Sequence, residues 1–145
     1  MITPRRLLVA APALLLLPRG AWATPEAMAA AVRDFTGGAT VRTGRVAMDI
    51  SPLVENGNTV PLSVIVDSPM TEQDHVRAVA VFNERNPQPH VITVRFGPRA
   101  GRALLATHIR LATSQTLLAV AACSDGSFWS DSAMVVVTLA ACVEG

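Results

Sequence analysis

The stretch that decides the fold is Leu117-Leu118-Ala119-Val120-Ala121-Ala122-Cys123-Ser124-Asp125-Gly126-Ser127-Phe128, which is followed by the β-branched run Met134-Val135-Val136-Val137-Thr138. Ser-Asp-Gly-Ser is typical of a hairpin turn, and apolar, β-branched runs on either side are typical of strands. We therefore expect a long β-hairpin formed by residues 116–123 and 128–139, with Trp129 packing at its turn.

Upstream of this hairpin the chain continues in short apolar or alternating runs, which predict further strands. Turn signals such as Asn56-Gly57 and Asn86-Pro87-Gln88-Pro89 separate these runs. Pro61 predicts an edge position or the start of a strand. Six or seven short strands in this order predict an all-β fold, an immunoglobulin-like antiparallel β-sandwich. The expected upstream strands lie near residues 46–50, 60–66, 76–82, 91–96 and 103–111.

One short helix is predicted before the strands. Thr24-Pro25-Glu26 supplies a hydroxyl N-cap, a proline at the first helical position and an acidic residue in the first turn. Good helix formers follow, with Met28, Ala31, Val32 and Phe35 on one face, and Gly37-Gly38 ends the run.

The first 23 residues have the pattern of a secretory signal peptide. A charged start containing Arg5-Arg6 precedes a short apolar core, and Ala21-Trp22-Ala23 forms an A-x-A ending. The core is too short to span a bilayer of about 30 Å. We expect cleavage before Thr24 and export to the periplasm, and the arginine pair indicates the twin-arginine route. The mature chain is then a single domain over residues 24–145.

The charge of the mature chain argues against nucleic acid or an anionic membrane as a partner. Three of the 12 basic residues fall in the predicted leader, so nine arginines face eleven acidic residues, a formal charge of −2. The chain has no lysine, and no stretch of it is a basic patch.

The titratable residues show no pattern typical of an enzyme. His75, His90 and His108 have no ligand-like spacing, so no metal or cofactor site is predicted. Three acidic residues, Asp67, Glu72 and Asp74, are expected to be a solvated loop rather than an acid–base pair. Neither Ser63 nor Ser114 lies in a nucleophile elbow. The domain is therefore not predicted to be an enzyme by itself.

Two cysteines, Cys123 and Cys142, lie in the mature chain. In the predicted hairpin, Cys123 sits beside the turn and Cys142 at the far end of the outgoing strand. Their sulfurs would be on the order of 40 Å apart, whereas a disulfide requires Cα atoms about 6 Å apart. We expect no such disulfide, with Cys123 packed in the core. Cys142 is then either a covalent handle presented to other proteins or an ordinary strand-end thiol.

Several loop motifs resemble the SoxY sulfur-carrier proteins of thiosulfate oxidation, in the same order along nearly the whole mature chain. These are Glu55-Asn56-Gly57-Asn58-Thr59-Val60-Pro61, Asp67-Ser68-Pro69-Met70-Thr71, Asn86-Pro87-Gln88-Pro89, Arg110-Leu111-Ala112-Thr113-Ser114-Gln115 and Ser124-Asp125-Gly126-Ser127-Phe128-Trp129. The resemblance implies a periplasmic immunoglobulin-like domain that forms a heterodimer with SoxZ. It also implies a near-C-terminal cysteine that carries sulfur intermediates covalently between a haem c enzyme, a dimanganese hydrolase and, in some organisms, a molybdenum enzyme.

By position the carrier residue would be Cys142, on an arm formed with Ala140, Ala141, Val143, Glu144 and Gly145. The family arm is typically Gly-Gly-Cys-Gly-Gly, so this arm is bulkier and stiffer. Glu144 and the terminal carboxylate also bring negative charge near the sulfur, which we expect to slow thiolate chemistry. The chain is thus a working carrier, a non-carrying paralogue used for binding or assembly, or an unrelated immunoglobulin-like periplasmic binding module.

Overall fold

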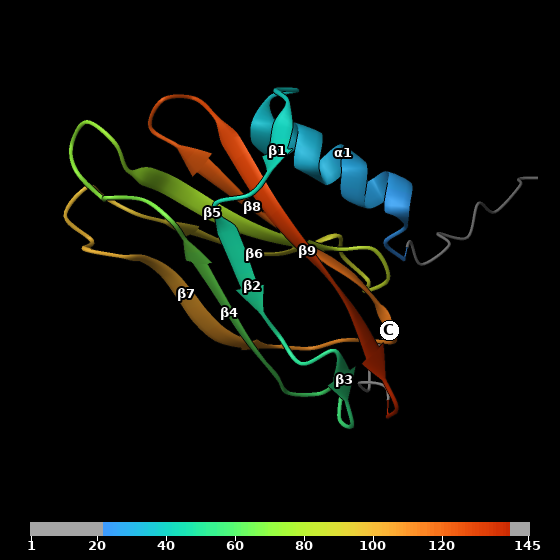
Figure 1. Cartoon of the computed structure of the whole chain (residues 1–145). Coiled ribbons are helices and arrows are strands. Elements are labelled where there is room, and N and C mark those ends of the chain that lie inside the picture. Colours follow the sequence, from blue (N-terminus) through green and yellow to red (C-terminus); the bar gives the residue numbers. More distant parts are fainter. Residues whose placement is uncertain (1–21, 140–145) are drawn as a thin grey trace, which may run out of the picture.

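Two β-sheets and one helix make up the computed structural model, which describes residues 22–139 (Figure 1). This arrangement confirms the predicted immunoglobulin-like β-sandwich preceded by a short helix. In chain order the elements are α1 (Pro25–Thr36), β1 (Val41–Thr43), β2 (Val46–Asp49), β3 (Leu53–Val54), β4 (Val60–Val66), β5 (Val76–Asn83), β6 (His90–Arg95), β7 (Ala103–Ile109), β8 (Gln115–Cys123) and β9 (Phe128–Val137).

The helix α1 begins and ends as its sequence predicts. The Thr24 hydroxyl accepts a hydrogen bond from the Ala27 amide at 3.1 Å, and Pro25 takes the first helical position, where no N–H is needed. Gly37 ends the helix in the left-handed region, with φ 66°, a conformation that glycine adopts without steric cost. The predicted apolar face, Met28, Ala31, Val32 and Phe35, packs against the larger sheet.

The larger sheet has the order β1-β9-β8-β5-β6. The β8–β9 hairpin therefore lies inside the sheet, with β5 beside β8 and β1 beside β9. The two strands pair antiparallel from Ala122↔Phe128 to Gln115↔Val135. The indole Nε1 of Trp129 donates to Ser127 Oγ at 3.1 Å, so Trp129 packs at the turn as predicted. The outgoing strand ends at Val137 rather than at the predicted residue 139. The next two residues bond not to β8 but to Val54, the last residue of β3, and to Glu55 after it.

Two short strands pair with β9 in parallel, which the sequence did not predict. β1 pairs along the first part of β9 and β3 along its last part, Leu53↔Val136 and Val54↔Val137. With three and two residues, these strands are too short to show a period-two alternation.

The smaller sheet has the order β2-β4-β7, so β4 lies in its middle. β2 pairs with β4 only from Ser63 to Val66. Pro61 therefore lies in the part of β4 that has no partner on the β2 side, an open edge at which a proline is tolerated. The prediction that Pro61 marks an open edge or a strand start is confirmed.

The main core lies between the two sheets, and a second cluster lies under the helix. In β4, four alternate residues, Val60, Leu62, Val64 and Val66, point into the main core. Under the helix, the Phe35 ring meets Phe82 and Phe128 edge to face at 6.0 and 6.1 Å. Each fully buried aliphatic or aromatic side chain contributes on the order of 1.5–3 kcal/mol to folding, so both sides of the larger sheet stabilise β8 and β9.

Candidate functional site at the base of the C-terminal arm

The predicted arm, Ala140, Ala141, Cys142, Val143, Glu144 and Gly145, lies outside the described residues. The structure does describe the backbone that leads into it, up to Leu139. The predicted attachment residue Cys142 follows three residues later. The candidate site is therefore the set of segments that surround the end of β9, here called the arm base: residues 52–57, 84–89, 110–116 and 136–139.

The end of β9 is joined to the segment that follows β2. Residues 136–139 and residues 52–57 lie side by side and exchange backbone hydrogen bonds well beyond the two residues of β3. The bonds are Val136 N to Pro52 O at 2.9 Å, Thr138 N to Val54 O at 3.0 Å, Leu139 N to Glu55 O at 3.1 Å and Gly57 N to Leu139 O at 2.9 Å. The backbone is thus fixed on one side up to the last described residue.

The loop between β7 and β8 holds the same stretch from the other side. The Ser114 hydroxyl accepts a hydrogen bond from the Val137 amide at 2.8 Å, and it lies 3.4 Å from the Val137 carbonyl, to which it donates. The Leu111 amide donates to the Gly57 carbonyl at 2.8 Å, and this bond closes the loop onto the segment after β3.

Asn86, in the turn between β5 and β6, ties the β7–β8 loop in place. Its Oδ1 accepts from the Ala112 amide at 2.9 Å and from Gln115 Nε2 at 2.8 Å, while its Nδ2 donates to the Arg110 carbonyl at 2.8 Å. Gln115 is buried, and its Oε1 in turn accepts from the Arg85 amide at 3.0 Å. A buried polar network with its partners supplied holds loops in one arrangement.

Three motifs that are far apart in the sequence therefore meet at one place. They are residues 55–58, 86–89 and 110–115, and they surround the end of β9. The motifs at 67–71 and 124–129 lie at strand ends on the opposite side, where Ser124 bonds the backbone of His75. Sequence reasoning singled out the motifs but did not predict that Ser114 and Asn86 would hold the arm base, because their partners are set by tertiary pairing.

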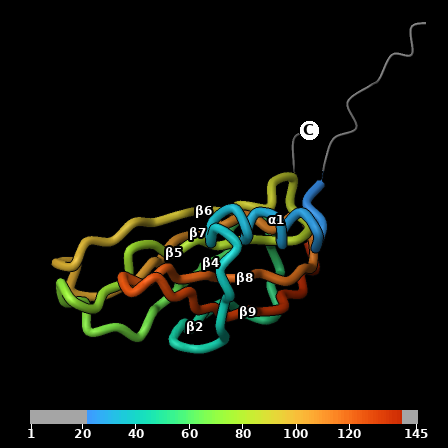
Figure 2. Tube along the Cα trace, turned by 90° about the horizontal axis from the view of Figure 1, so that it is seen from above, coloured from blue at the N-terminus to red at the C-terminus, as the bar shows by residue number. Residues whose placement is uncertain are grey.

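The start of the described chain reaches the same end of the molecule (Figure 2). The Ala23 amide donates to the Asn86 carbonyl at 2.8 Å, and Ala23 is buried. Trp22 and Ala23 line a hollow of about 380 Å³ together with Arg85, Ala112 and Thr113. Both residues fall within the predicted signal peptide, so cleavage before Thr24 would remove this contact and open the hollow beside the arm base.

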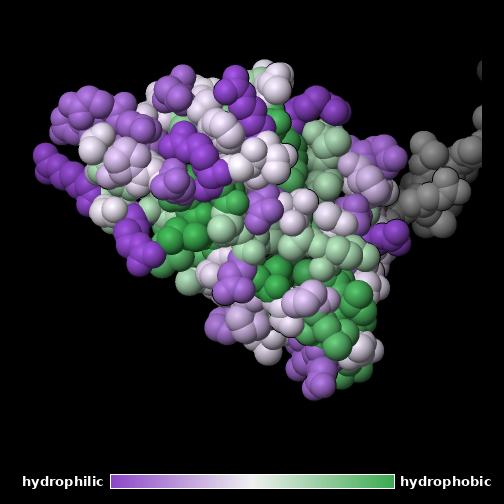
Figure 3. All heavy atoms as spheres, in the orientation of Figure 1, coloured by the Kyte–Doolittle hydropathy of each residue, from purple (hydrophilic) through white to green (hydrophobic). Residues whose placement is uncertain are grey.

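Apolar side chains are exposed around the arm base. Leu53, Met134, Val136 and Leu139 are exposed by 58%, 58%, 45% and 63%. Leu53 and Val136 are register partners, and Met134 lies two residues earlier on the same face of β9. Figure 3 shows hydrophobic spheres gathered at this lower end of the molecule, over β3 and the end of β9.

The histidines and the loop carboxylates, for which the sequence predicts no metal site and no acid–base pair, are spread over different parts of the fold. His75 Nδ1 is 3.0 Å from the Thr71 carbonyl, and His90 Nε2 is 2.7 Å from Thr93 Oγ1, on separate elements. Within residues 22–139, no group of three histidine, cysteine or acidic side chains is placed to hold a metal ion. Of the loop carboxylates, Asp74 lies 3.9 Å from the Arg45 guanidinium.

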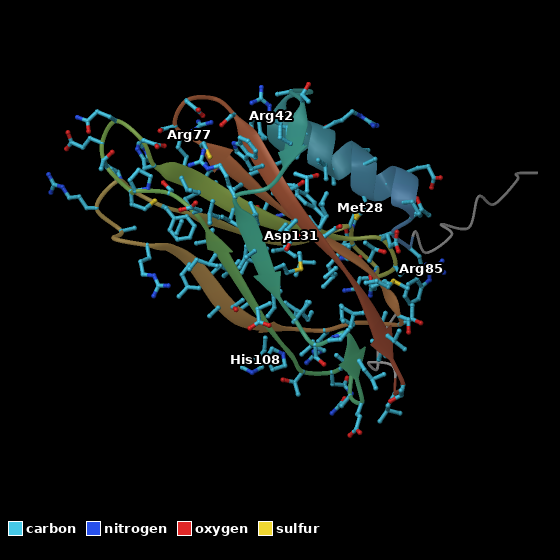
Figure 4. The ribbon with its side chains drawn as sticks, viewed as in Figure 1. Met28, Arg42, Arg77, Arg85, His108 and Asp131 are labelled. Carbon is cyan, nitrogen blue, oxygen red and sulfur yellow. The ribbon has the colours of Figure 1, made fainter. Side chains whose placement is uncertain are left out.

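Cys123 is fully buried in the main core, as predicted. Burial raises the pKa of its thiol above the ordinary value, partly offset by the nearby Arg45 charge. It lies beside the β8–β9 turn, where Arg77 Nε donates to its carbonyl at 3.1 Å. Figure 4 shows Arg77 at one end of the molecule and Arg85, of the arm base, at the other. The ten residues of β9 separate the two ends.

The sequence model of one protein family, described as sulfur oxidation protein SoxY, matches residues 32–142. The chain belongs to the SoxY family. The matched region includes all the strands, the three loops of the arm base and the predicted attachment position. None of the curated proteins matches the chain in sequence.

Solved structures share the fold at low sequence identity. The SoxY sulfur carrier protein from Chlorobium limicola f thiosulfatophilum aligns with a TM-score of 0.67 and 20% identity, covering 79% of this chain and 98% of its own. A superoxide reductase (neelaredoxin) from Ignicoccus hospitalis aligns with a TM-score of 0.59 and 16% identity, covering 79% and 94%. A putative superoxide reductase from Thermotoga maritima aligns with a TM-score of 0.54 and 23% identity, covering 72% and 90%. At these identities the likeness shows the fold alone.

Within residues 22–139, no helix combines the length and the apolar character needed to cross a membrane.

Proposed function

We propose that this SoxY-family chain is a covalent sulfur carrier of thiosulfate oxidation, and that Cys142 is the attachment residue. The observation that carries the proposal is the meeting of three family motifs around residues 136–139, three residues before that cysteine. A carrier needs a fixed support and a free reactive end. The hydrogen bonds of the arm base supply the support, and the thiol supplies the chemistry.

The proposed carrier cycle uses reversible cysteine chemistry. In the loading step, the Cys142 sulfur bonds to the outer sulfur of thiosulfate, and one proton and two electrons leave, the electrons passing to the haem c partner. In the release step, water attacks the sulfonate sulfur, sulfate departs and a persulfide remains on Cys142. In this proposal partner enzymes supply the electron acceptor and the hydrolytic group, and the chain acts as the carrier.

The same proposal includes a SoxZ-type partner subunit and a periplasmic location. The predicted leader supports export, and family membership supports the partner. An exported thiol in an oxidising compartment is open to unwanted oxidation.

The altered arm supports a second candidate function. Ala140, Ala141, Val143 and Glu144 stand where the family typically has glycine, and they add bulk and negative charge beside the sulfur. In that case the chain would keep the fold and the partner but would serve as a binding or assembly subunit. The two functions differ in whether the thiol is required.

Complementation separates these two functions. A thiosulfate-oxidising strain that lacks the gene would receive the wild-type chain, Cys142→Ala or Cys123→Ala, and thiosulfate consumption would be measured. We expect Cys142→Ala to abolish the restored consumption, while Cys123→Ala retains it in proportion to the amount of folded protein. Full restoration by Cys142→Ala would overturn the carrier role and favour the assembly role.

A further inference from the structure

The exposed apolar side chains of the molecule are concentrated beside the arm base. Among the described residues, seven large hydrophobic side chains are exposed. Four of them, Leu53, Met134, Val136 and Leu139, form the group described above, here called the apolar collar. Of the other three, Trp22 lies at the start of the described chain, and Ile65 and Leu104 are register partners on the smaller sheet, remote from the arm base. Exposed apolar groups gathered in one place mark interaction surfaces more often than single ones do.

None of the described residues covers the collar. The helix α1 covers the other end of the same sheet face, where it packs on Phe82, Val120 and Phe128. Towards the end of β9, the face that carries Phe128 continues through Ser132 and Met134 to Val136, and these three residues are exposed. The only polar contact of the Met134 side chain with described residues is the Thr116 hydroxyl, 3.6 Å from its sulfur.

The length of the arm decides what must approach this surface. Cys142 is three residues beyond Leu139. A fully extended chain spans at most about 3.6 Å per residue, so the Cα of Cys142 lies within about 11 Å of the Cα of Leu139. Hydrogen bonds fix the backbone up to Leu139, so the reach cannot grow without breaking them. Any protein group that reacts with the Cys142 sulfur must therefore bring its surface against the arm base.

We propose that the apolar collar is the docking surface for the enzyme that loads Cys142, and that it fits an apolar rim around that enzyme's entrance. This inference rests on the proposed carrier function. A permanently bound subunit on the collar would fill the space that a catalytic entrance needs, so the SoxZ-type partner is expected on another face. A small apolar contact also suits a carrier that must leave each enzyme again, since transient complexes bury little surface.

The test compares sulfur loading of collar variants with loading of a matched control. Met134→Asp and Leu53→Asp would place a charge in the collar at sites exposed enough to tolerate it, and Ile65→Asp would place the same charge on the remote patch. Each full-length chain would be incubated with the thiosulfate-conjugating haem c enzyme of its own Sox system and with thiosulfate. The rate of mass gain on Cys142 would be followed, with iodoacetamide alkylation of Cys142 and co-purification of the SoxZ-type subunit measured in parallel.

We expect both collar variants to load at least about tenfold more slowly, with unchanged alkylation, unchanged subunit binding and normal loading of Ile65→Asp. Loading of both collar variants at the wild-type rate would overturn the inference. So would loss of subunit binding in step with loading, which would make the collar the subunit interface, or a selective defect of Ile65→Asp. If the wild-type chain itself gains no mass at Cys142, it is the proposed carrier function that fails.

Discussion

The Ser114 hydroxyl bonds both backbone polar groups of Val137, accepting from its amide at 2.8 Å and donating to its carbonyl at 3.4 Å. One short side chain thus replaces a strand partner at the end of β9, because β8 pairs with β9 only as far as Val135. The backbone that leads into the arm is therefore held by hydrogen bonds, although β9 no longer pairs with β8 beyond Val135.

Removing this hydroxyl should loosen the arm base more than the fold. Ser114→Ala leaves the Val137 amide without its partner, at a cost of about 1 kcal/mol in the free energy of unfolding. Amide hydrogen exchange at residues 137–139 should accelerate selectively, as a local opening would produce. Ser132→Ala, on the exposed face of the same strand, is the control and should leave this exchange unchanged. Equal exchange in both variants would mean that Ser114 does not hold the strand end.

Asn86 should matter more to global stability, because its side chain joins three separate groups. Asn86→Ala removes one partner each from the Ala112 amide, Gln115 Nε2 and the Arg110 carbonyl. We expect a loss of about 2 kcal/mol or more in urea unfolding. Asn56→Ala is the matched control, since within residues 22–139 its side chain accepts only local bonds from Asn58, in an exposed turn. That variant should lose less than about 1 kcal/mol, and a similar loss in both variants would contradict the network role of Asn86.

The buried thiol of Cys123 should make stability fall at alkaline pH. Burial raises its pKa above the ordinary value of 9.0, so the folded chain holds the proton more tightly than the unfolded chain. The resulting stabilisation is complete below pH 9.0 and is lost as pH rises through the folded-state pKa. Urea unfolding of the wild type and of Cys123→Ala on both sides of pH 9.0 measures this, and the alanine variant should lack this component of the decline. An identical pH dependence in both chains would show that the thiol titrates normally.

The acidic residue beside the predicted carrier thiol should slow its reactions. In Glu144→Gln, alkylation of Cys142 by iodoacetamide should be roughly two- to threefold faster at low salt, because one nearby negative charge no longer opposes thiolate formation. The difference should shrink at high salt, where charges are screened. Glu72→Gln, in a loop at the opposite end, is the control. If Glu144→Gln reacted at the wild-type rate, the Glu144 charge would not be what slows the thiol of this divergent arm.

The parts of the fold that follow from local pattern were predictable. The α1 boundaries are set by Thr24 and Gly37, and the β8–β9 turn is set by Asp125 and Gly126, so each is determined by a few neighbouring residues. The parallel pairing of β3 with β9 was not predictable, because two residues carry no periodicity and the pairing joins segments more than 80 residues apart. β3 starts directly after Pro52, and a Ser-Pro pair is typical of a break between strands, so the local sequence gives no sign of this strand.

For the candidate site, the sequence led to a proposed carrier thiol but not to the residues that hold the arm base. The position of Cys142 near the chain end, together with the resemblance, led to the proposal of that thiol, which stays a prediction. The residues that fix its base are ordinary serine, asparagine and glutamine side chains in loops, and their partners lie 23 to 29 residues away in the sequence. In the sequence such residues indicate only turns. Their shared role at the arm base depends on the tertiary structure, which brings their partners together.

The central claim is that Cys142 carries sulfur, and intact mass spectrometry of the chain purified from thiosulfate-grown cells tests it most directly. The measurement would be made with and without reductant, beside a Cys142→Ala variant. We predict reductant-labile mass additions that match sulfane or thiosulfate groups in the wild type and their absence in the variant. An unmodified wild-type chain from cells that are oxidising thiosulfate, or the same additions on Cys142→Ala, would contradict the carrier role.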